Sequence, residues 1–387
     1  MPFTIAKNPP GSISGKASFQ PIQAPAAAAP AARNNNKRPQ RGDMEPHQHG
    51  SSHGEARAID IHTHFVPEHF PPLPAGSKET TWPSMAPGES CCHRHVMVKG
   101  ENYRTVTNQC WEGPKRVEDM AATGVTRQVL SPMPELLSYW MSGEDAAVLH
   151  RDINEQMARL AAAHPDKFTA FAAVPLQDVD LAIAELEYAA TVLKMAGAEI
   201  GSNINGRPIG APEFVPFFAA AERLGMAIFV HAIRPVMDRV IGPPQLEQVL
   251  GFPNEIGHAA ASVITTSLIL RHPNLKIAFS HGGGSLAMLL PRLQHAWTRF
   301  PGLRGKIEVA PFEQARRLFY DTLVYDRDTL LFLIQRFGAD ALMLGTDYPF
   351  TIMESDPVGR LTQAGLDEAT RNKLRYENAD RFLSGAG

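Results

Sequence analysis

Two histidines end a short apolar stretch and could together hold a metal ion. Residues 58–65 read AIDIHTHF. Successive side chains of a β-strand alternate between its two faces, so His62 and His64 would point the same way. Two imidazoles on one face can bind one divalent ion. The pair alone does not establish a site, because many such pairs lie at a protein surface, and the remaining ligands must come from elsewhere in the chain.

Three further polar residues each come directly after an apolar run. His231 follows AIFV, His281 follows IAFS, and Asp347 follows LMLGT. A single such histidine is usually a hydrogen-bonded core residue, but four histidines and an aspartate in equivalent positions are poorly explained that way. Imidazoles and a carboxylate suit Zn²⁺ or a similar ion. We therefore expect one divalent metal ion, with zinc favoured over manganese.

These residues need a fold that brings the ends of many strands together. Strand-like runs alternate with helix-like segments, and the runs centre near residues 59, 128, 171, 199, 228, 278, 320 and 343. Strand–helix alternation predicts an α/β fold with a parallel sheet, and eight units predict a closed (β/α)8 TIM barrel. In that fold the chemistry lies at the C-terminal ends of the strands, where all five candidates would fall.

The chain is not uniform in composition. Residues 1–55 are dominated by Pro, Ala, Gly, Ser, Asn, Lys and Arg, which predicts a low-complexity tail that is disordered or extended. Residues 56–387 would form the barrel domain. Within it, residues 66–112 are rich in Pro, Gly and polar side chains. A segment of this length after the first strand predicts an irregular insertion that acts as a lid or binding loop.

The overall composition is that of a soluble enzyme. Of the 387 residues, 44% are hydrophobic and 20% charged, and the net charge is −3, so neither nucleic acid nor an anionic membrane is an expected partner. No apolar run approaches the ~20 residues of a spanning helix. Three cysteines, two of them adjacent, indicate no disulfide framework, and we expect a cytoplasmic protein. The glycines at 282–284 lack dinucleotide-binding spacing, so we expect no organic cofactor.

The motifs together resemble the metal-dependent amidohydrolase superfamily, specifically its decarboxylase branch, and within it the 2-amino-3-carboxymuconate-6-semialdehyde decarboxylases. The resemblance covers the chain from about residue 58 to its end. The matching stretches are IDIHTH at 59–64, SYW at 138–140, FVH at 229–231, SHGGG at 280–284 and GTDYPF at 345–350. The fourth strand is followed by serine and asparagine and carries no lysine of the kind that bridges two ions in binuclear members, which favours one ion.

The resemblance implies a role for each candidate. His62, His64, His231 and Asp347 correspond to the metal ligands. His281 corresponds to an acid/base residue, and Asp347 is implied to be catalytic as well as a ligand. The metal would lower the pKa of a bound water toward ~7. This water and the neighbouring histidine would assist proton transfer to the carbon that loses CO₂.

Arg292 matches an arginine that these decarboxylases insert into the active site of a neighbouring subunit. A guanidinium there would bind a substrate carboxylate through two parallel hydrogen bonds. The working enzyme would then be at least a homodimer. The alternative is that Arg292 is an ordinary arginine on the surface of a helix.

The insertion departs from the family pattern. These decarboxylases carry a substrate-binding arginine three residues before a Cys-Trp pair, and Thr107 occupies that position here. Either Arg104 takes over its role, or the substrate carries one carboxylate fewer. We prefer the second reading, which points to a hydroxylated aromatic or heteroaromatic monoacid. Its ring would pack against Trp140, Phe65 or Phe350.

The sequence therefore predicts a metal-dependent, non-oxidative decarboxylase of a small hydroxylated aromatic, heteroaromatic or unsaturated carboxylic acid. The alternative is a hydrolase of the same superfamily that uses the same metal site to cleave a C–N, lactone or C–C bond. A non-catalytic binding protein on the same barrel is disfavoured by the full set of candidate ligands.

Overall fold

The computed structural model describes residues 57–90, 92–238 and 240–385. The chain divides into two compact units, residues 1–53 and 54–387, and the description that follows concerns the second. The expected tail, residues 1–55, lies outside the described residues.

Eight parallel strands form one sheet in the order in which they occur along the chain, and each pairs with the next. Backbone hydrogen bonds from Ile61 to Leu344 (3.0 Å) and from His64 to Tyr348 (2.7 Å) join the last strand to the first. The predicted TIM barrel is confirmed. Its strands are β1 (Ile59–Phe65), β5 (Arg127–Pro132), β6 (Phe168–Ala173), β7 (Gly197–Gly201), β10 (Ala227–His231), β11 (Ile277–Phe279), β12 (Phe319–Asp321) and β13 (Leu342–Met343).

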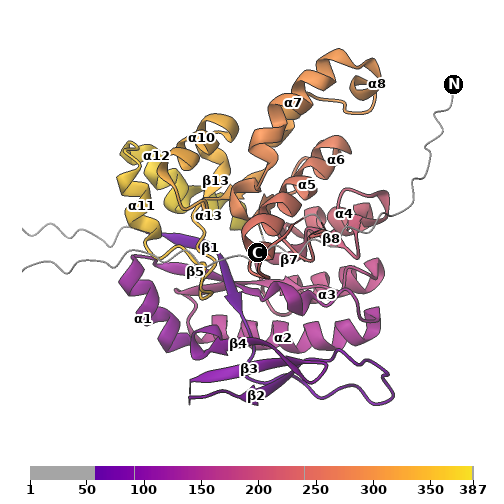
Figure 1. Cartoon of the computed structure of the whole chain (residues 1–387), viewed down its shortest axis with the longest axis vertical. Helices are drawn as coiled ribbons and strands as arrows, with labels where there is room; N and C mark the ends of the chain where they lie inside the picture. Colours follow the sequence, from indigo (N-terminus) through magenta and orange to yellow (C-terminus); the bar gives the residue numbers. More distant parts are fainter. Residues whose placement is uncertain (1–56, 91, 239, 386–387) are drawn as a thin grey trace, which may run out of the picture. The chain divides into compact units, whose positions relative to one another are not determined.

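Helices surround the strands (Figure 1). They are α1 (Gly113–Thr123), α2 (Gly143–Ala163), α3 (Val179–Thr191), α4 (Val215–Leu224), α5 (Phe252–Thr265), α6 (Leu268–Arg271), α7 (Leu286–Arg299), α8 (Pro301–Arg304), α9 (Pro311–Ala315), α10 (Arg327–Phe337), α11 (Pro357–Gln363), α12 (Glu368–Asn372) and α13 (Asn378–Leu383). Ser267 adopts a left-handed conformation (φ 55°) and separates α5 from α6. Among the described residues, no helix is long and apolar enough to cross a membrane.

Apolar side chains fill the barrel below the candidate site. Ile61, Val129 and Phe229 are fully buried in one cluster, and α13 contributes Phe382 to it. The Phe382 ring lies 5.2 Å from that of Phe319, the first residue of β12. Because Phe319 begins its strand, α13 covers the N-terminal end of the barrel and leaves the C-terminal end for the site.

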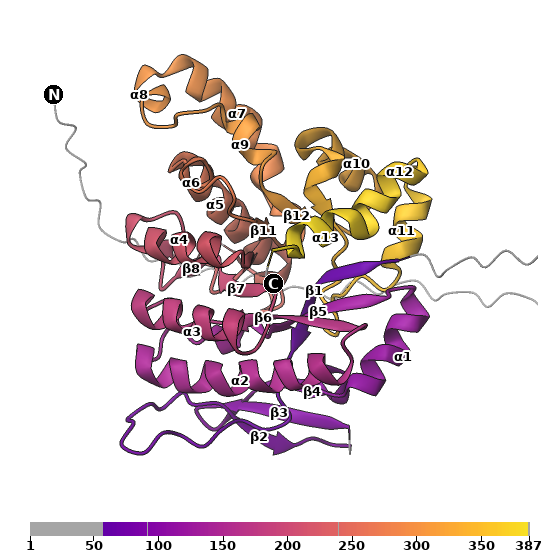
Figure 2. The same cartoon turned by 180° about the vertical axis from the view of Figure 1, so that it is seen from behind.

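The insertion between β1 and α1 is more regular than expected. It contains a three-stranded antiparallel sheet of β2 (Ser84–Pro87), β3 (His93–Val98) and β4 (Glu101–Thr107). Only Val96 and Val106 of these strands are buried, so the alternation that reveals a strand is weak in the sequence. Figures 1 and 2 show this sheet beside α2, whereas α7 and α8 project on the opposite side of the barrel. A short hairpin of β8 (Asn203–Ile204) and β9 (Arg207–Pro208) follows β7.

Helix α2 anchors the turn that follows the second barrel strand. Its fully buried His150 donates a hydrogen bond from Nε2 to the carbonyl oxygen of Leu136 (3.1 Å), within the short helical turn η2 (Pro134–Leu137). Burial lowers the pKa of His150 to about 4. The folded protein therefore holds this ring neutral under conditions in which the unfolded chain would protonate it.

We expect the His150→Gln variant to lose less stability in acid than the parent protein. A histidine with a pKa lower in the folded state contributes stability that is present above its unfolded pKa and is lost as the pH falls toward the folded value. The window is therefore from about pH 6.5 down to about pH 4, and the loss between pH 7 and pH 5 is about 2 kcal/mol. Urea unfolding of both proteins at the two pH values measures it, and an equal loss in both would contradict the assignment.

Candidate metal centre

The first barrel strand carries the two histidines into the interior of the site. Every residue of β1 is buried, and His62 and His64 are both fully inaccessible. The strand is held from outside by Arg116 of α1, which donates hydrogen bonds to the His64 carbonyl oxygen and to Gln128 Oε1 (3.0 Å). The same guanidinium lies over the ring of Tyr348, 5.0 Å from its centroid. One buried side chain thus contacts both segments that supply ligands.

Four side chains converge at the C-terminal end of the barrel. The candidate ligand atoms of His62, His64, His231 and Asp347 all lie within 4.8 Å of one another. Asp347 Oδ1 is 2.7 Å from His64 Nε2 and 3.3 Å from His62 Nε2. The Nε2 atoms of His62 and His231 are buried and have no hydrogen-bond partner among the described residues. Buried nitrogens without partners raise the free energy of the folded protein. A divalent cation held by these four side chains would give both nitrogens a partner.

Two of the rings are held by their other nitrogen, as is typical of metal-binding histidines. His62 Nδ1 donates to Asp321 Oδ2 (2.7 Å) and His231 Nδ1 donates to the carbonyl oxygen of Ala232 (2.8 Å). Asp321 ends β12 and also accepts backbone N–H bonds from His281 (2.9 Å) and Gly282 (2.7 Å). These contacts fix the tautomers and leave Nε2 of both rings facing the centre.

The segment after β13 is fastened to β1 from beneath. Thr346 donates from Oγ1 to Asp60 Oδ2 (2.6 Å), and the Asp347 N–H donates to the carbonyl oxygen of His62 (2.9 Å). Burial raises the pKa of Asp60 to about 7. A Cβ atom at Gly345 would lie 2.8 Å from the Asp321 Cβ and 3.0 Å from the His62 Cβ. Only glycine therefore lets this segment approach closely enough for Asp347 to join the histidines.

The charges of the site favour a cation. Burial lowers the pKa of His64, and burial together with the neighbouring histidines lowers that of His231 well below its usual value, so both rings are neutral. Burial opposes ionisation of Asp347, but its interactions with the nearby His62 and His64 outweigh burial and lower its pKa well below the ordinary range. Burial likewise opposes charge on His62, yet Asp321 and Asp347 raise its pKa to about 10. Asp321 and Asp347 thus both stabilise a positive charge at His62. A metal ion bound by this set could supply that charge.

His281 lies beside this set without belonging to it. Its ring centroid is 5.1 Å from that of His231 and 5.5 Å from that of His62. The surrounding protein shields the ring from bulk water and, with repulsion from His62, lowers the pKa of His281 to about 4. The ring is therefore a neutral group that can accept or pass on a proton near the centre.

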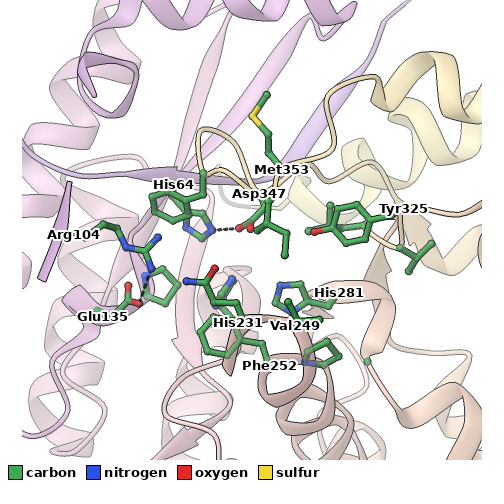
Figure 3. Close-up of a pocket in the computed structure, with 18 of the residues that line it drawn as sticks. His64, Arg104, Glu135, His231, Val249, Phe252, His281, Tyr325, Asp347 and Met353 are labelled. Carbon is green, nitrogen blue, oxygen red and sulfur yellow. Dashed lines mark hydrogen bonds and ion pairs between the residues drawn. The ribbon is translucent and has the colours of Figure 1, made fainter. Parts of the chain in front are cut away.

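The centre opens into a cavity of about 550 Å³. Figure 3 shows Arg104 and Glu135 on one side of the labelled site and Tyr325 on the other, with His64, His231, His281 and Asp347 between them. The remaining lining is largely apolar, and it comprises Pro134, Gln248, Val249, Phe252, Pro253, Gly284, Leu323, Val324, Thr329, Phe350, Ile352 and Met353.

The predicted substrate residues fall in different places. Arg104 and Phe350 line this cavity, whereas Trp140 lines a second cavity of about 940 Å³ next to it. Thr107 donates its hydroxyl to Gln109 Oε1 (2.8 Å) and lines neither cavity, and Phe65 is buried away from both. Arg292 is exposed on α7, outside the cavity of its own chain.

Several residues of the site carried little signal in the sequence. Asp321 ends a strand as Asp347 nearly does, so the same reasoning could have singled it out. Glu135, Phe252 and Tyr325 lie in turns or at helix starts, where neither periodicity nor spacing marks them.

We expect Asp321→Asn to weaken binding of Mn²⁺ or Zn²⁺ about 10- to 100-fold, because the amide holds His62 less firmly and removes a negative charge. Titration against a chelating indicator measures the affinity. Asp340→Asn is the matched control, since Asp340 is an exposed acid paired with Lys373. Unchanged affinity in the Asp321 variant would show that His62 needs no support from this carboxylate.

Comparisons with known proteins agree with this geometry. The family model described as amidohydrolase matches residues 59–384. The 2-amino-3-carboxymuconate-6-semialdehyde decarboxylase of Dictyostelium discoideum is 33% identical over 84% of this chain and 91% of its own length. The crystal structure of 2,6-dihydroxybenzoate decarboxylase from Rhizobium superposes with a TM-score of 0.69 at 25% identity, over 86% of this chain and 99% of that one.

A third protein shares the fold and was crystallised with a metal. The dihydroxybenzoic acid decarboxylase from Polaromonas sp., with bound manganese and the inhibitor 2-nitroresorcinol, superposes with a TM-score of 0.64 at 20% identity. The superposition covers 84% of this chain and 96% of that one. From the family match across nearly the whole barrel and the four converging ligands, this chain belongs to the amidohydrolase family.

Proposed function

We propose that this chain is a metal-dependent carboxy-lyase that removes CO₂, without oxidation, from a small hydroxylated aromatic, heteroaromatic or unsaturated carboxylic acid. The observation that carries the proposal is the set of three histidines and one aspartate at the base of a largely apolar cavity, with the neutral His281 beside it. The decarboxylase activities named for the relatives from Dictyostelium and Rhizobium support it.

One divalent ion would be held by His62, His64, His231 and Asp347. This donor set accepts both Zn²⁺ and Mn²⁺. We propose zinc as the native ion and manganese as the alternative, which the manganese in the Polaromonas structure supports. When bound, the ion would stabilise the negative charge that develops on the substrate as the C–C bond breaks.

His281 has the position and charge of the proton-transfer residue. Loss of CO₂ leaves an electron pair on the ring carbon, which must then receive a proton. A neutral imidazole can relay that proton, because it carries a donor nitrogen and an acceptor nitrogen. The backbone of His281 is fixed by its N–H bond to Asp321, so the ring would be oriented before the substrate arrives.

The apolar cavity would hold the substrate ring. Phe350 stacks on His64 with 4.8 Å between ring centroids and 17° between planes, so it would place an aromatic substrate next to a metal ligand. Because Thr107 lies outside the cavity while Arg104 lines it, Arg104 is the only one of the two that can meet substrate there. We propose a hydroxylated aromatic or heteroaromatic monoacid as the substrate.

We further propose that the protein works in the cytoplasm as a homodimer in which Arg292 reaches the active site of the partner. Its support is the exposed position of Arg292 on α7, a helix that projects from the barrel (Figures 1 and 2).

Incubation of the zinc- or manganese-loaded protein with hydroxybenzoates and hydroxypicolinates should release CO₂. We expect His281→Ala to keep its metal and to lose turnover by about 10²- to 10⁴-fold. Metal content by atomic absorption and CO₂ release by a coupled assay separate the two effects. Loss of the metal from this variant would make His281 a ligand, and a ring-opened acid or ammonia without CO₂ would make the protein a hydrolase instead.

The role of Arg292 can be tested by mixing two inactive proteins. We expect Arg292→Ala and His281→Ala to be inactive alone. After unfolding and refolding together, half of the dimers contain one protomer of each kind, and one of their two sites has both residues intact. Activity should return to about a quarter of the parent value. If no activity returns although mixed dimers form, Arg292 does not act across the interface.

A further inference from the structure

Glu135 forms part of the wall between the two cavities. It lies in the turn η2, directly after the second barrel strand, and Pro134, Glu135 and Phe252 line both the metal cavity and the larger cavity under the insertion. Its Oε1 accepts a hydrogen bond from Arg104 Nη2 at 3.3 Å, and the two side chains are 20% and 21% exposed. Its Oε2 is buried and has no hydrogen-bond partner among the described residues.

The position of the pair places it next to the metal ligands. The Arg104 guanidinium lies over Phe350, 4.5 Å from the ring centroid, and Phe350 in turn stacks on His64. Figure 3 shows Arg104 and Glu135 joined on the side of the pocket nearest His64. A substrate held at the metal centre would therefore have this pair beside its ring.

The pair has the wrong charge for a second carboxylate. The Glu135 carboxylate already compensates the positive charge of Arg104, so a further anion would have to displace it and would be repelled by it. Burial and the Glu135 carboxylate raise the pKa of Glu247, and Glu247 lines the adjoining cavity. Two carboxylates, Glu135 and Glu247, thus lie near Arg104, although Lys99 and Arg234 also line the adjoining cavity.

The same geometry suits a neutral donor. An ionised carboxylate oxygen accepts hydrogen bonds only, so the group that satisfies Oε2 must offer an O–H or N–H. A buried acceptor without a partner costs free energy, and a substrate group that donates to it recovers that cost on binding. Tyr103 interacts with Glu135 through its phenol, and burial and that carboxylate raise the pKa of the phenol. The hydroxyl forms no bond of regular geometry to Oε2, so a substrate donor would compete with Tyr103 for this oxygen.

We propose that Glu135, held by Arg104, is a specificity-determining residue that selects acids bearing a hydroxyl or amino group on the ring and rejects acids bearing a second carboxylate. The inference rests on the proposed function, because it concerns the substrate of the same site.

Binding of matched probes to the metal-loaded, full-length protein tests this directly. The probes are 3- and 4-hydroxybenzoate, compared with benzene-1,3- and benzene-1,4-dicarboxylate, which replace the hydroxyl with a carboxylate at the same ring position. Isothermal titration calorimetry gives each dissociation constant and requires no turnover. We expect the parent protein to bind a hydroxy acid more tightly than its matched diacid.

Two substitutions of similar volume separate the charge of Glu135 from its capacity to accept a hydrogen bond. Glu135→Leu should weaken hydroxy-acid binding about 10-fold or more and strengthen diacid binding by a similar factor, because Arg104 becomes free. Glu135→Gln should strengthen diacid binding as well but retain most hydroxy-acid binding, since an amide oxygen remains. Glu101→Gln, an exposed acid that lines only the second cavity, is the control and should change neither.

A purely structural role for Glu135 would shift both classes of probe together. Parallel changes, or no change in the preference of either variant, would overturn the inference. If the leucine variant does not fold, as judged by circular dichroism and metal content, improved diacid binding by the glutamine variant decides the question. A reversed preference in a protein that releases no CO₂ from any acid would refute the proposed function while leaving this inference intact.

Discussion

The rest of the site depends on the hydrogen bonds that the Asp321 carboxylate accepts. It stands at the end of β12 and accepts one hydrogen bond from the His62 ring and two from the backbone N–H groups of His281 and Gly282. One fully buried anion therefore orients both His62, a candidate metal ligand, and His281, the proposed proton-transfer residue. Its own charge is stabilised by these donors, so the support is mutual, and the loss of any one contact would disturb the others.

Around that carboxylate, the barrel separates two tasks between different parts of the chain. The metal-binding frame consists of strand ends that are tied to one another by Asp60, Arg116 and backbone hydrogen bonds. The wall of the cavity proposed to hold the substrate comes from β4 of the insertion, from the turn η2 and from the segment after Asp347. His150 fastens η2 to α2, so this wall also has rigid support. Chemistry and selectivity can thus vary independently in such a fold.

The metal ligands were predictable because each leaves a local mark in the sequence. An apolar run that ends in histidine or aspartate indicates a strand end, and the alternation of strands and helices brings those ends together. Asp321 also ends a strand and could have been singled out as a candidate, but its supporting contact with His62, 259 positions away, leaves no local mark in the sequence. The left-handed Ser267, which separates α5 from α6, has no sequence signature. The strands of the insertion were missed because only one face of them carries buried valines. The role proposed for Glu135 depends on its contact with Arg104, 31 positions away in the sequence.

The position of the Phe350 ring would allow substrate binding to be detected spectroscopically at the metal. The ring contacts the Arg104 guanidinium and the His64 imidazole at the same time. This one ring therefore connects the wall of the cavity to a candidate metal ligand. A displacement of this ring by an incoming acid would tilt His64 and alter the ligand field at the ion. In a cobalt-substituted protein the visible absorption bands would then report which group had reached the far side of the ring, and the metal would serve as an optical sensor of substrate recognition.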